Sequence, residues 1–176
     1  MLQVGDKHFE PYINKVQIQK AVENIAIAIE KDLAGETPLF IGVLNGSFMF
    51  CADFMKAYTS ECEISFVKMA SYEKTTSTGN VNQLLGLNED LKGRTVVVLE
   101  DIVDTGNTLE KIYEILETEN IKTLKIATLF FKPSVFDKDL KIDYVGMEIP
   151  DEFILGYGLD YDGLGRNLSD IYKLSN

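Results

Sequence analysis

The chain has 176 residues, of which 45% are hydrophobic and 26% charged, and such a chain can bury the core of one globular domain. It contains no long apolar run, so no membrane-spanning helix is expected, and its net charge of −11 argues against nonspecific binding to nucleic acid. His8 is the only histidine, which nearly excludes a histidine-dependent triad and a zinc site built from several histidines.

The predicted elements alternate between helix and strand. Apolar residues recur every three or four positions in 18–33 and predict an amphipathic helix, which Asn14 would cap and Gly35 would end. An apolar strand is expected at Leu39–Leu44, and a turn then leads into a helix that begins near Phe48. Further strands are predicted at 63–70, 96–101, 123–131, 142–149 and 153–159. This order predicts an α/β fold with a Rossmann-like parallel sheet flanked by helices on both faces.

The most informative stretch runs from Val96 to Leu109. Its first four residues are apolar and predict a strand buried on both faces, which ends in Glu100 and Asp101, side chains that a pleat directs to opposite sides. The small polar turn 105–108 then opens a helix, and free N–H groups beside hydroxyls at a helix start bind anions, phosphate above all. The two acids suit ribose hydroxyls or hydrated Mg²⁺. We therefore expect a phosphorylated sugar as the ligand.

Three further strand ends carry polar turns, at 45–47, at 132–134 and from Asp160 onward. Ligands of parallel sheets bind beyond the carboxyl ends of the strands, so we expect these turns to converge on one crevice. Ser71–Asn82 is the one long polar stretch between predicted strands. It is either an irregular connection or a lid that closes over a ligand, and the sequence leaves both interpretations open.

The pattern Glu-Asp-x-x-Asp-Thr-Gly-x-Thr over 100–108 resembles the motif with which type I phosphoribosyltransferases bind 5-phosphoribosyl-1-pyrophosphate (PRPP). Other parts of the chain are similar to further motifs of that family, in the same order. They are the pyrophosphate loop with its non-proline cis peptide at 43–47, the start of the flexible loop at 71–72, the base-binding strand end at 131–133, and 150–161 with Arg166 beyond it. Together they cover nearly the whole chain, which thus resembles the hypoxanthine or hypoxanthine-guanine phosphoribosyltransferases.

The resemblance implies a type I phosphoribosyltransferase fold over residues 1–176 as a single domain. A small hood would be built from the N-terminal segment and from the C-terminal segment around 150–176. The implied substrates are PRPP and a 6-oxopurine base, the implied metal is Mg²⁺, and the reaction gives the nucleoside monophosphate and pyrophosphate in purine salvage. Members of the family are usually dimers or tetramers, so a homo-oligomer is expected.

The resemblance also assigns the phosphate, ribose and metal contacts. The 5′-phosphate would bind at Thr105, Gly106, Asn107 and Thr108. Pyrophosphate would bind at Asn45, Gly46 and Arg166. The ribose hydroxyls would bind at Glu100 and Asp101, and Mg²⁺ at Glu100, Asp101 and Asp160. Many relatives have Lys or Arg at the position of Asn45, so this chain lacks one cation in its pyrophosphate loop.

The remaining assignments concern the base and the chemistry. Asp104 would act as general base or acid at purine N7, and Ser71 and Tyr72 would close over the reacting centre. Lys132 would donate to the purine O6, Phe153 would stack on the base, and the backbone of Ile154 would contact its edge. Taken singly, Phe153 would more often be a core residue, and Lys132 and Arg166 solvated surface charges.

Two other functions remain open. Another phosphoribosyltransferase of this fold would act on xanthine, adenine or orotate, and Lys132 with the Phe153–Ile154 pair favours a 6-oxopurine without excluding xanthine. A PRPP-sensing regulator that binds nucleic acid is disfavoured by the net charge. Cys51 and Cys62 have no metal or redox spacing, so buried reduced thiols are expected. With no evident signal peptide, these thiols indicate the cytoplasm.

Overall fold

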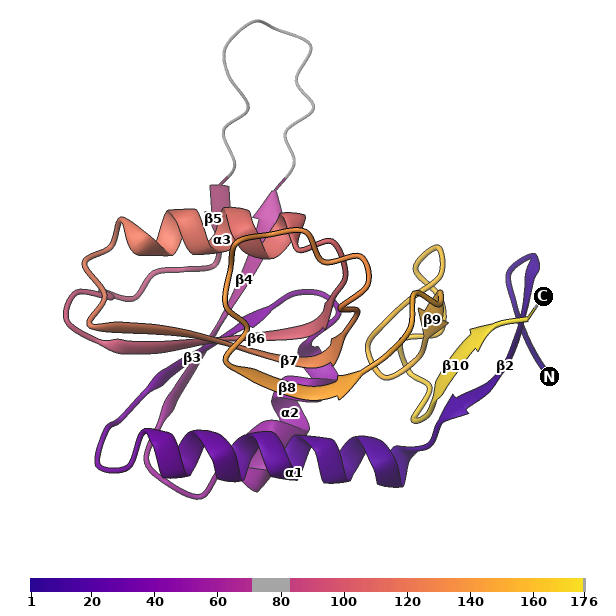
Figure 1. The fold of residues 1–176 in the computed structure, drawn as a ribbon, viewed down its shortest axis with the longest axis horizontal. Helices are drawn as coiled ribbons and strands as arrows, with labels where there is room; N and C mark the ends of the chain where they lie inside the picture. The colour runs from indigo at the N-terminus through magenta and orange to yellow at the C-terminus, as the bar shows by residue number, and fades with distance from the viewer. Residues whose placement is uncertain (71–82, 176) are drawn as a thin grey trace, which may run out of the picture.

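The computed structural model describes residues 1–70 and 83–175. Its main sheet has six strands in the order β5-β4-β3-β6-β7-β8 (Figure 1). The strands are β3 (Leu39–Val43), β4 (Glu63–Ala70), β5 (Gln83–Leu85), β6 (Thr95–Val103), β7 (Thr123–Phe131) and β8 (Tyr144–Glu148). The edge strand β5 pairs antiparallel with β4, and the other pairs are parallel. The predicted parallel sheet is therefore confirmed.

Helices cover both faces of this sheet, as predicted. They are α1 (Lys15–Asp32), α2 (Phe48–Ala57) and α3 (Asn107–Glu117). In Figure 1, α1 and α2 lie on one side of the strands and α3 on the other. Successive residues of β6 face opposite helices: Val97 and Leu99 pack with α1 and α2, whereas Val96 and Val98 pack with α3. The central strand is thus buried on both faces, which explains its unbroken apolar run.

The start of α1 confirms the predicted cap. The side chain of Asn14 accepts hydrogen bonds from the backbone N–H groups of Val16 and Gln17, and the Gln17 side chain accepts one from the Asn14 N–H at 3.1 Å. This reciprocal pair satisfies donors that the first turn of a helix leaves free. The helix ends at Asp32, and Gly35 adopts a positive φ of 84° just beyond it.

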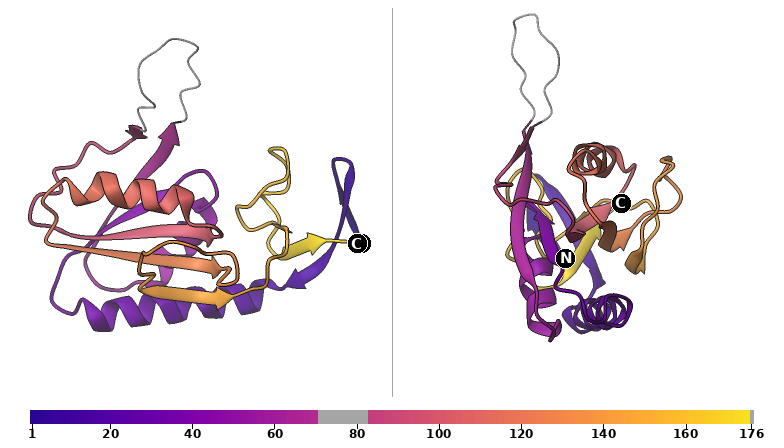
Figure 2. Two further views of the ribbon diagram at one scale, coloured as in Figure 1. Left: turned by 45° about the horizontal axis from the view of Figure 1, so that its top comes forward. Right: turned by 90° about the vertical axis from the view of Figure 1, so that its left-hand side faces the viewer.

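A second sheet joins the two ends of the chain. It has four strands in the order β1-β2-β10-β9, all antiparallel: β1 (Leu2–Val4), β2 (Lys7–Ile13), β9 (Ile154–Leu155) and β10 (Ile171–Leu174). Figure 2 shows it beside the carboxyl ends of β6, β7 and β8. The second sheet therefore lies on the side of the main sheet where ligands of parallel sheets bind.

Some predicted boundaries were wrong. The predicted strand at 153–159 is reduced to β9, which belongs to the second sheet, because the chain turns at Gly156 and Gly158 with positive φ angles. The strand predicted at 96–101 continues to Val103, and α3 begins at Asn107 rather than at Leu109. Strands β1, β2, β5 and β10 were not predicted at all.

Both cysteines are free thiols: Cys51 is buried and Cys62 is partly buried. Burial raises the pKa of Cys51 to about 12, so this thiol stays protonated at neutral pH.

Within residues 1–70 and 83–175, no helix is long and apolar enough to cross a bilayer.

Candidate active site

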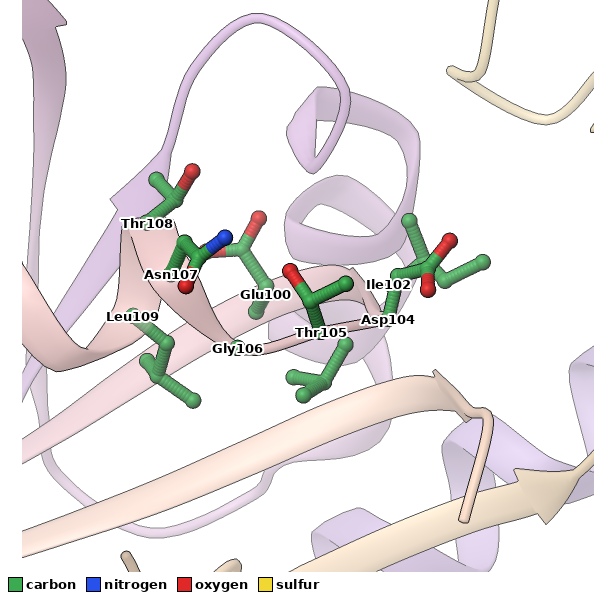
Figure 3. Close-up of a pocket in the computed structure, with 9 residues that line it drawn as sticks. Glu100, Ile102, Asp104, Thr105, Gly106, Asn107, Thr108 and Leu109 are labelled. Atoms are coloured by element: carbon green, nitrogen blue, oxygen red, sulfur yellow. The ribbon is translucent and has the colours of Figure 1, made fainter. Parts of the chain in front are cut away.

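A pocket of about 250 Å³ opens where β6 ends and α3 begins. It is lined by Glu100, Ile102, Val103, Asp104, Thr105, Gly106, Asn107, Thr108 and Leu109. Figure 3 shows the side chains of Glu100, Thr105 and Asn107 projecting to one side of the loop. Glu100 and the turn 105–108, which were predicted to contact ribose and phosphate, thus line one cavity, and Asp101 is not among its lining residues.

The loop turns at Gly106, the N-cap residue of α3, which has a φ of 84°. A Cβ on this residue would lie 2.6 Å from Cε2 of Phe136 and 2.9 Å from Cγ of Lys138, so both conformation and space require glycine. Within the described residues, no side chain forms a capping hydrogen bond at this helix start. The first N–H groups of α3 therefore remain available to an anionic ligand.

Glu100 and Asp101 are almost completely buried, with 9% and 6% exposure. Burial raises the pKa of Glu100 well above its usual value, and the neighbouring Asp101 carboxylate raises it further. Burial also raises the pKa of Asp101, against hydrogen bonds and the charge of Arg166, which lower it. Among the described residues, Oε2 of Glu100 has no hydrogen-bond partner. A buried oxygen without a partner fits a site that a ribose hydroxyl or a cation completes.

The loop after β3 lies beside these acids. The Leu44–Asn45 peptide bond is cis, as the resemblance to the pyrophosphate loop implies. The next residue, Gly46, lies so close to Asp101 that a Cβ on it would overlap the carboxylate. A Cβ on Gly158 would in turn overlap the carbonyl oxygen of Gly46. The loop after β3 is therefore in contact both with the carboxyl end of β6 and with the turn after β9.

The fourth strand end supplies a buried cation. Lys132 is 5% exposed, and its Nζ lies 3.0 Å from Oδ2 of Asp104 and 3.1 Å from Oδ1 of Asp151. Burial lowers the pKa of Lys132, but its hydrogen bonds to the two carboxylates outweigh this effect, so the pKa is raised overall. Lys132 is therefore a charged donor inside the protein and not a solvated strand end.

Comparison with known proteins agrees with this geometry. Residues 12–162 match the family model described as the phosphoribosyl transferase domain. The chain belongs to the phosphoribosyltransferase family. A curated relative from Staphylococcus aureus, named hypoxanthine-guanine phosphoribosyltransferase, is 38% identical over 166 residues, which cover 94% of this chain and 93% of the relative. A relative of the same name from Bacillus subtilis is 39% identical, over 89% of this chain and 87% of the relative.

Solved structures show the same type I phosphoribosyltransferase fold. A hypoxanthine-guanine phosphoribosyltransferase from Bacillus anthracis superimposes with a TM-score of 0.86 at 38% identity, covering 94% of this chain and 98% of that one. A hypoxanthine phosphoribosyltransferase from Trypanosoma cruzi gives a TM-score of 0.85 at 30% identity, over 99% of this chain and 95% of that one. This phosphoribosyltransferase therefore has the predicted fold class.

The segment expected to contact the base lies in the second sheet of this phosphoribosyltransferase. The Phe153 ring is 46% exposed, with Phe9 at 6.3 Å and Tyr161 at 6.0 Å between ring centroids. Ile154 is buried and pairs with Lys173 of β10. Phe153 is therefore not a core residue, and one face of an aromatic cluster remains accessible for stacking.

Two residues assigned to different ligands are paired with each other. Nη2 of Arg166 lies 2.6 Å from Oδ1 of Asp160, and its Nη1 donates to the Gly158 carbonyl at 2.6 Å. Within the part of the chain that the structure describes, no group of three or more acidic, His or Cys side chains is close enough to hold a metal. The structure thus does not gather Glu100, Asp101 and Asp160 into one ligand set. Mg²⁺ usually binds one or two carboxylates, water and substrate phosphates, so Glu100 and Asp101 still fit it.

Two residues with assigned roles, Ser71 and Tyr72, cannot be placed, and the sequence analysis missed one partner of Lys132. Ser71 and Tyr72, with the whole stretch proposed as a lid, lie outside the described residues. Asp151, the second partner of Lys132, was given no role from the sequence. Its place within the motif 150–161 was visible, but its contact with a lysine nineteen positions earlier depends on how the two segments pack.

Proposed function

We propose that this protein transfers the 5-phosphoribosyl group from PRPP to hypoxanthine and guanine, giving IMP or GMP and pyrophosphate in purine salvage. The observation that carries the proposal is the buried, charged Lys132 at the strand end next to the phosphate pocket. A cation at that place can donate to a 6-oxo group and would be repelled by the amino donor of adenine. The names of the curated relatives support the same substrates.

The pocket at 105–108 would hold the 5′-phosphate of PRPP, through the free N–H groups at the start of α3 and the hydroxyls of Thr105 and Thr108. Glu100 and Asp101 would accept hydrogen bonds from the ribose hydroxyls. Positive charge develops on the ribose when the bond to pyrophosphate breaks, and these buried carboxylates would stabilise it electrostatically. The 5-phosphoribosyl group would thereby be held by its phosphate and its ribose, while its anomeric carbon stays accessible to the base.

Pyrophosphate would leave toward the loop Asn45–Gly46, with Arg166 beside it. Mg²⁺, the metal used with PRPP in this family, would neutralise the departing charge when bound by Glu100 and Asp101. Arg166 would exchange part of its contact with Asp160 for the phosphate oxygens, which makes Asp160 available to the metal through water. We propose this exchange as the reason why Asp160 belongs to the site.

The base would lie between the phosphate pocket and the second sheet. Lys132 would donate to O6, Asp104 would accept or return the proton at N7, and Phe153 would stack on the ring. The backbone of Ile154 would contact the edge of the base. In this proposal, residues 1–176 form a single domain in which the second sheet acts as the hood. We also propose a homo-oligomer located in the cytoplasm.

A panel of nucleobases assayed with PRPP and Mg²⁺ tests the proposal. Hypoxanthine and guanine should be converted to nucleoside monophosphates, and adenine and orotate should not. Turnover of xanthine alone would contradict the assignment of the base while leaving the reaction type intact. If the protein bound RNA or DNA at low salt and converted none of the bases, the proposed enzyme activity would be wrong, and the function would be that of a PRPP-binding regulator.

A further inference from the structure

Tyr157 is a buried tyrosine to which the proposed reaction gives no role. It follows β9, is 4% exposed and has a φ of 47°, and its neighbours Gly156 and Gly158 have φ angles of 107° and 100°. Residues with a Cβ rarely adopt this left-handed conformation, which persists only where surrounding contacts hold it. We call Gly156–Gly158 the Tyr157 turn, and its contacts indicate what it does.

The side chain of Tyr157 connects this turn to α2. Its hydroxyl donates to Oδ2 of Asp53 at 2.7 Å, and Nζ of Lys56 lies 2.8 Å from the other oxygen, Oδ1. Burial and the hydrogen bond to Asp53 raise the pKa of Tyr157, so the hydroxyl remains a donor at neutral pH. Each carboxylate oxygen of Asp53 thus has its own partner, and the partner of Oδ2 is the tyrosine.

The backbone of the Tyr157 turn contacts both elements proposed to bind pyrophosphate. The Gly158 N–H donates to the Arg166 carbonyl at 3.0 Å, and Nη1 of Arg166 donates back to the Gly158 carbonyl at 2.6 Å. The Tyr157 N–H donates to the Leu168 carbonyl at 2.8 Å. Gly158 also lies against the Gly46 carbonyl, which an added Cβ would overlap. A displacement of the turn would therefore move Arg166 relative to the pyrophosphate loop.

Two separate contacts hold the Tyr157 turn against the segment that runs from the pyrophosphate loop into α2. One is the contact between Gly158 and Gly46, and the other is the hydrogen bond from Tyr157 to Asp53. Both lie on one continuous segment, since α2 begins at Phe48, directly after the loop. A single contact would let the turn rotate about it, whereas two contacts set its orientation.

We infer that Tyr157 and Asp53 are positioning residues for pyrophosphate, and that their hydrogen bond sets the separation between Arg166 and the loop Asn45–Gly46. The inference rests on the proposed function, in which pyrophosphate leaves between these two elements. Donors that are already in place bind a polyanion more tightly, because no free energy is spent on ordering them. The effect should be confined to PRPP and pyrophosphate, since Lys132, which would contact the base, follows a different strand.

Titration calorimetry of the full chain with pyrophosphate and, separately, with PRPP, each in the presence of Mg²⁺, tests the inference. Tyr157→Phe removes the hydroxyl and keeps the ring, so both dissociation constants should rise about three- to tenfold, as for the loss of one hydrogen bond. The KM for the base that the enzyme converts should stay unchanged at saturating PRPP. A wild-type protein that binds neither ligand overturns the proposed function and the inference together. If the wild type binds both and Tyr157→Phe binds them equally well, the inference alone is overturned.

Tyr144→Phe is the matched control. The Tyr144 hydroxyl also donates to an aspartate, Oδ2 of Asp32, at 2.5 Å, and this aspartate is likewise paired with a lysine, Lys125, at 2.6 Å. The bond joins the end of α1 to the start of β8, at the opposite end of the sheet from the ligand loops. Tyr144→Phe should therefore leave both dissociation constants unchanged. If it weakens pyrophosphate binding as much as Tyr157→Phe does, general stability explains the effect and the inference is overturned.

A double-mutant cycle tests whether the two residues act through one bond. Asp53→Ala removes the acceptor and gives a second variant should Tyr157→Phe not fold. Its loss of the Lys56 pair matters little, because that lysine side chain is 75% exposed. The double variant Tyr157→Phe/Asp53→Ala should bind pyrophosphate about as weakly as either single variant. Effects that multiply would mean that each residue acts by a separate route, which overturns the inference.

Discussion

The Nζ of Lys132 lies 3.0 Å from Oδ2 of Asp104, so the cation proposed to recognise the base contacts the carboxylate proposed to move its proton. Asp151 holds the same ammonium from another side at 3.1 Å. The ammonium is buried, whereas the two carboxylate side chains are 47% and 59% exposed. A ligand can therefore reach both acids, and their similar contacts with Lys132 make them a matched pair for mutation.

Asp104→Asn should lower kcat by about 10²–10⁴-fold, because the amide keeps the size of the carboxylate but cannot accept a proton. Asp151→Asn removes a comparable contact with Lys132 but no proton acceptor at N7, so its kcat should fall by less than about tenfold. Steady-state kinetics with hypoxanthine and PRPP measure both variants. If the two variants lose kcat equally, or Asp104→Asn keeps more than half of it, Asp104 only positions Lys132.

Lys132→Met should change the choice of base rather than the affinity for PRPP. Methionine keeps most of the alkyl stem and removes the ammonium, and loss of a charged hydrogen bond costs about 1.5–3 kcal/mol. The value of kcat/KM for hypoxanthine should fall by roughly 10–150-fold, whereas that for adenine should fall less or rise. The measurement is the ratio of kcat/KM for hypoxanthine to kcat/KM for adenine at saturating PRPP, which should be smaller in the variant than in the wild type.

Lys138→Met provides the control for this lysine. Lys138 is also largely shielded and paired, at 3.2 Å from Glu110, but its stem packs against Gly106 in the phosphate pocket. Its substitution should leave the ratio of hypoxanthine to adenine unchanged. Equal effects of Lys132→Met on both bases would place the contact with the 6-position elsewhere.

Gly158→Ala should destabilise the protein more than Gly163→Ala. Both glycines have positive φ angles, of 100° and 79°, but a Cβ on Gly163 meets nothing within 4 Å, whereas one on Gly158 overlaps the Gly46 carbonyl. The conformational strain alone costs about 1–3 kcal/mol, and the overlap at Gly158 adds to it. Urea denaturation gives both free energies of unfolding, and equal values would show that the loop can move away from Gly46.

The pocket between β6 and α3 could be predicted from the sequence because its parts are local. The apolar start of β6, the acids Glu100 and Asp101, the turn at Gly106 and the start of α3 follow one another within a few residues. Each part has its own physical signature, namely a buried strand, a carboxylate pair and a helix start with free N–H groups. Only the predicted end of β6 and the predicted start of α3 differ from the structure.

The strands of the second sheet could not be predicted from local patterns, because they are defined by partners at the other end of the chain, and only the family resemblance implied that the two terminal segments come together. In β2, Lys7, His8, Glu10 and Pro11 interrupt any apolar pattern, and the strand exists because β10 pairs with it. The contact between Lys132 and its acidic partners has the same cause, since the burial of a lysine depends on packing between distant segments. Long-range pairing leaves little trace in the local sequence.

Asn45→Lys should strengthen the binding of pyrophosphate and PRPP. Asn45 is exposed in the loop proposed to receive pyrophosphate, and it lies next to Gly46, which contacts the Asp101 carboxylate. In a chain with a net charge of −11, one cation at this loop offsets part of the field that repels a polyanion. The KM for both ligands should fall by a few fold at low ionic strength, and the gain should shrink as salt screens the added charge. Asn45→Gln lengthens the side chain without adding charge and should leave both KM values near those of the wild type. A gain that does not depend on salt, or one that glutamine reproduces, would show that side-chain length rather than charge limits binding at this loop.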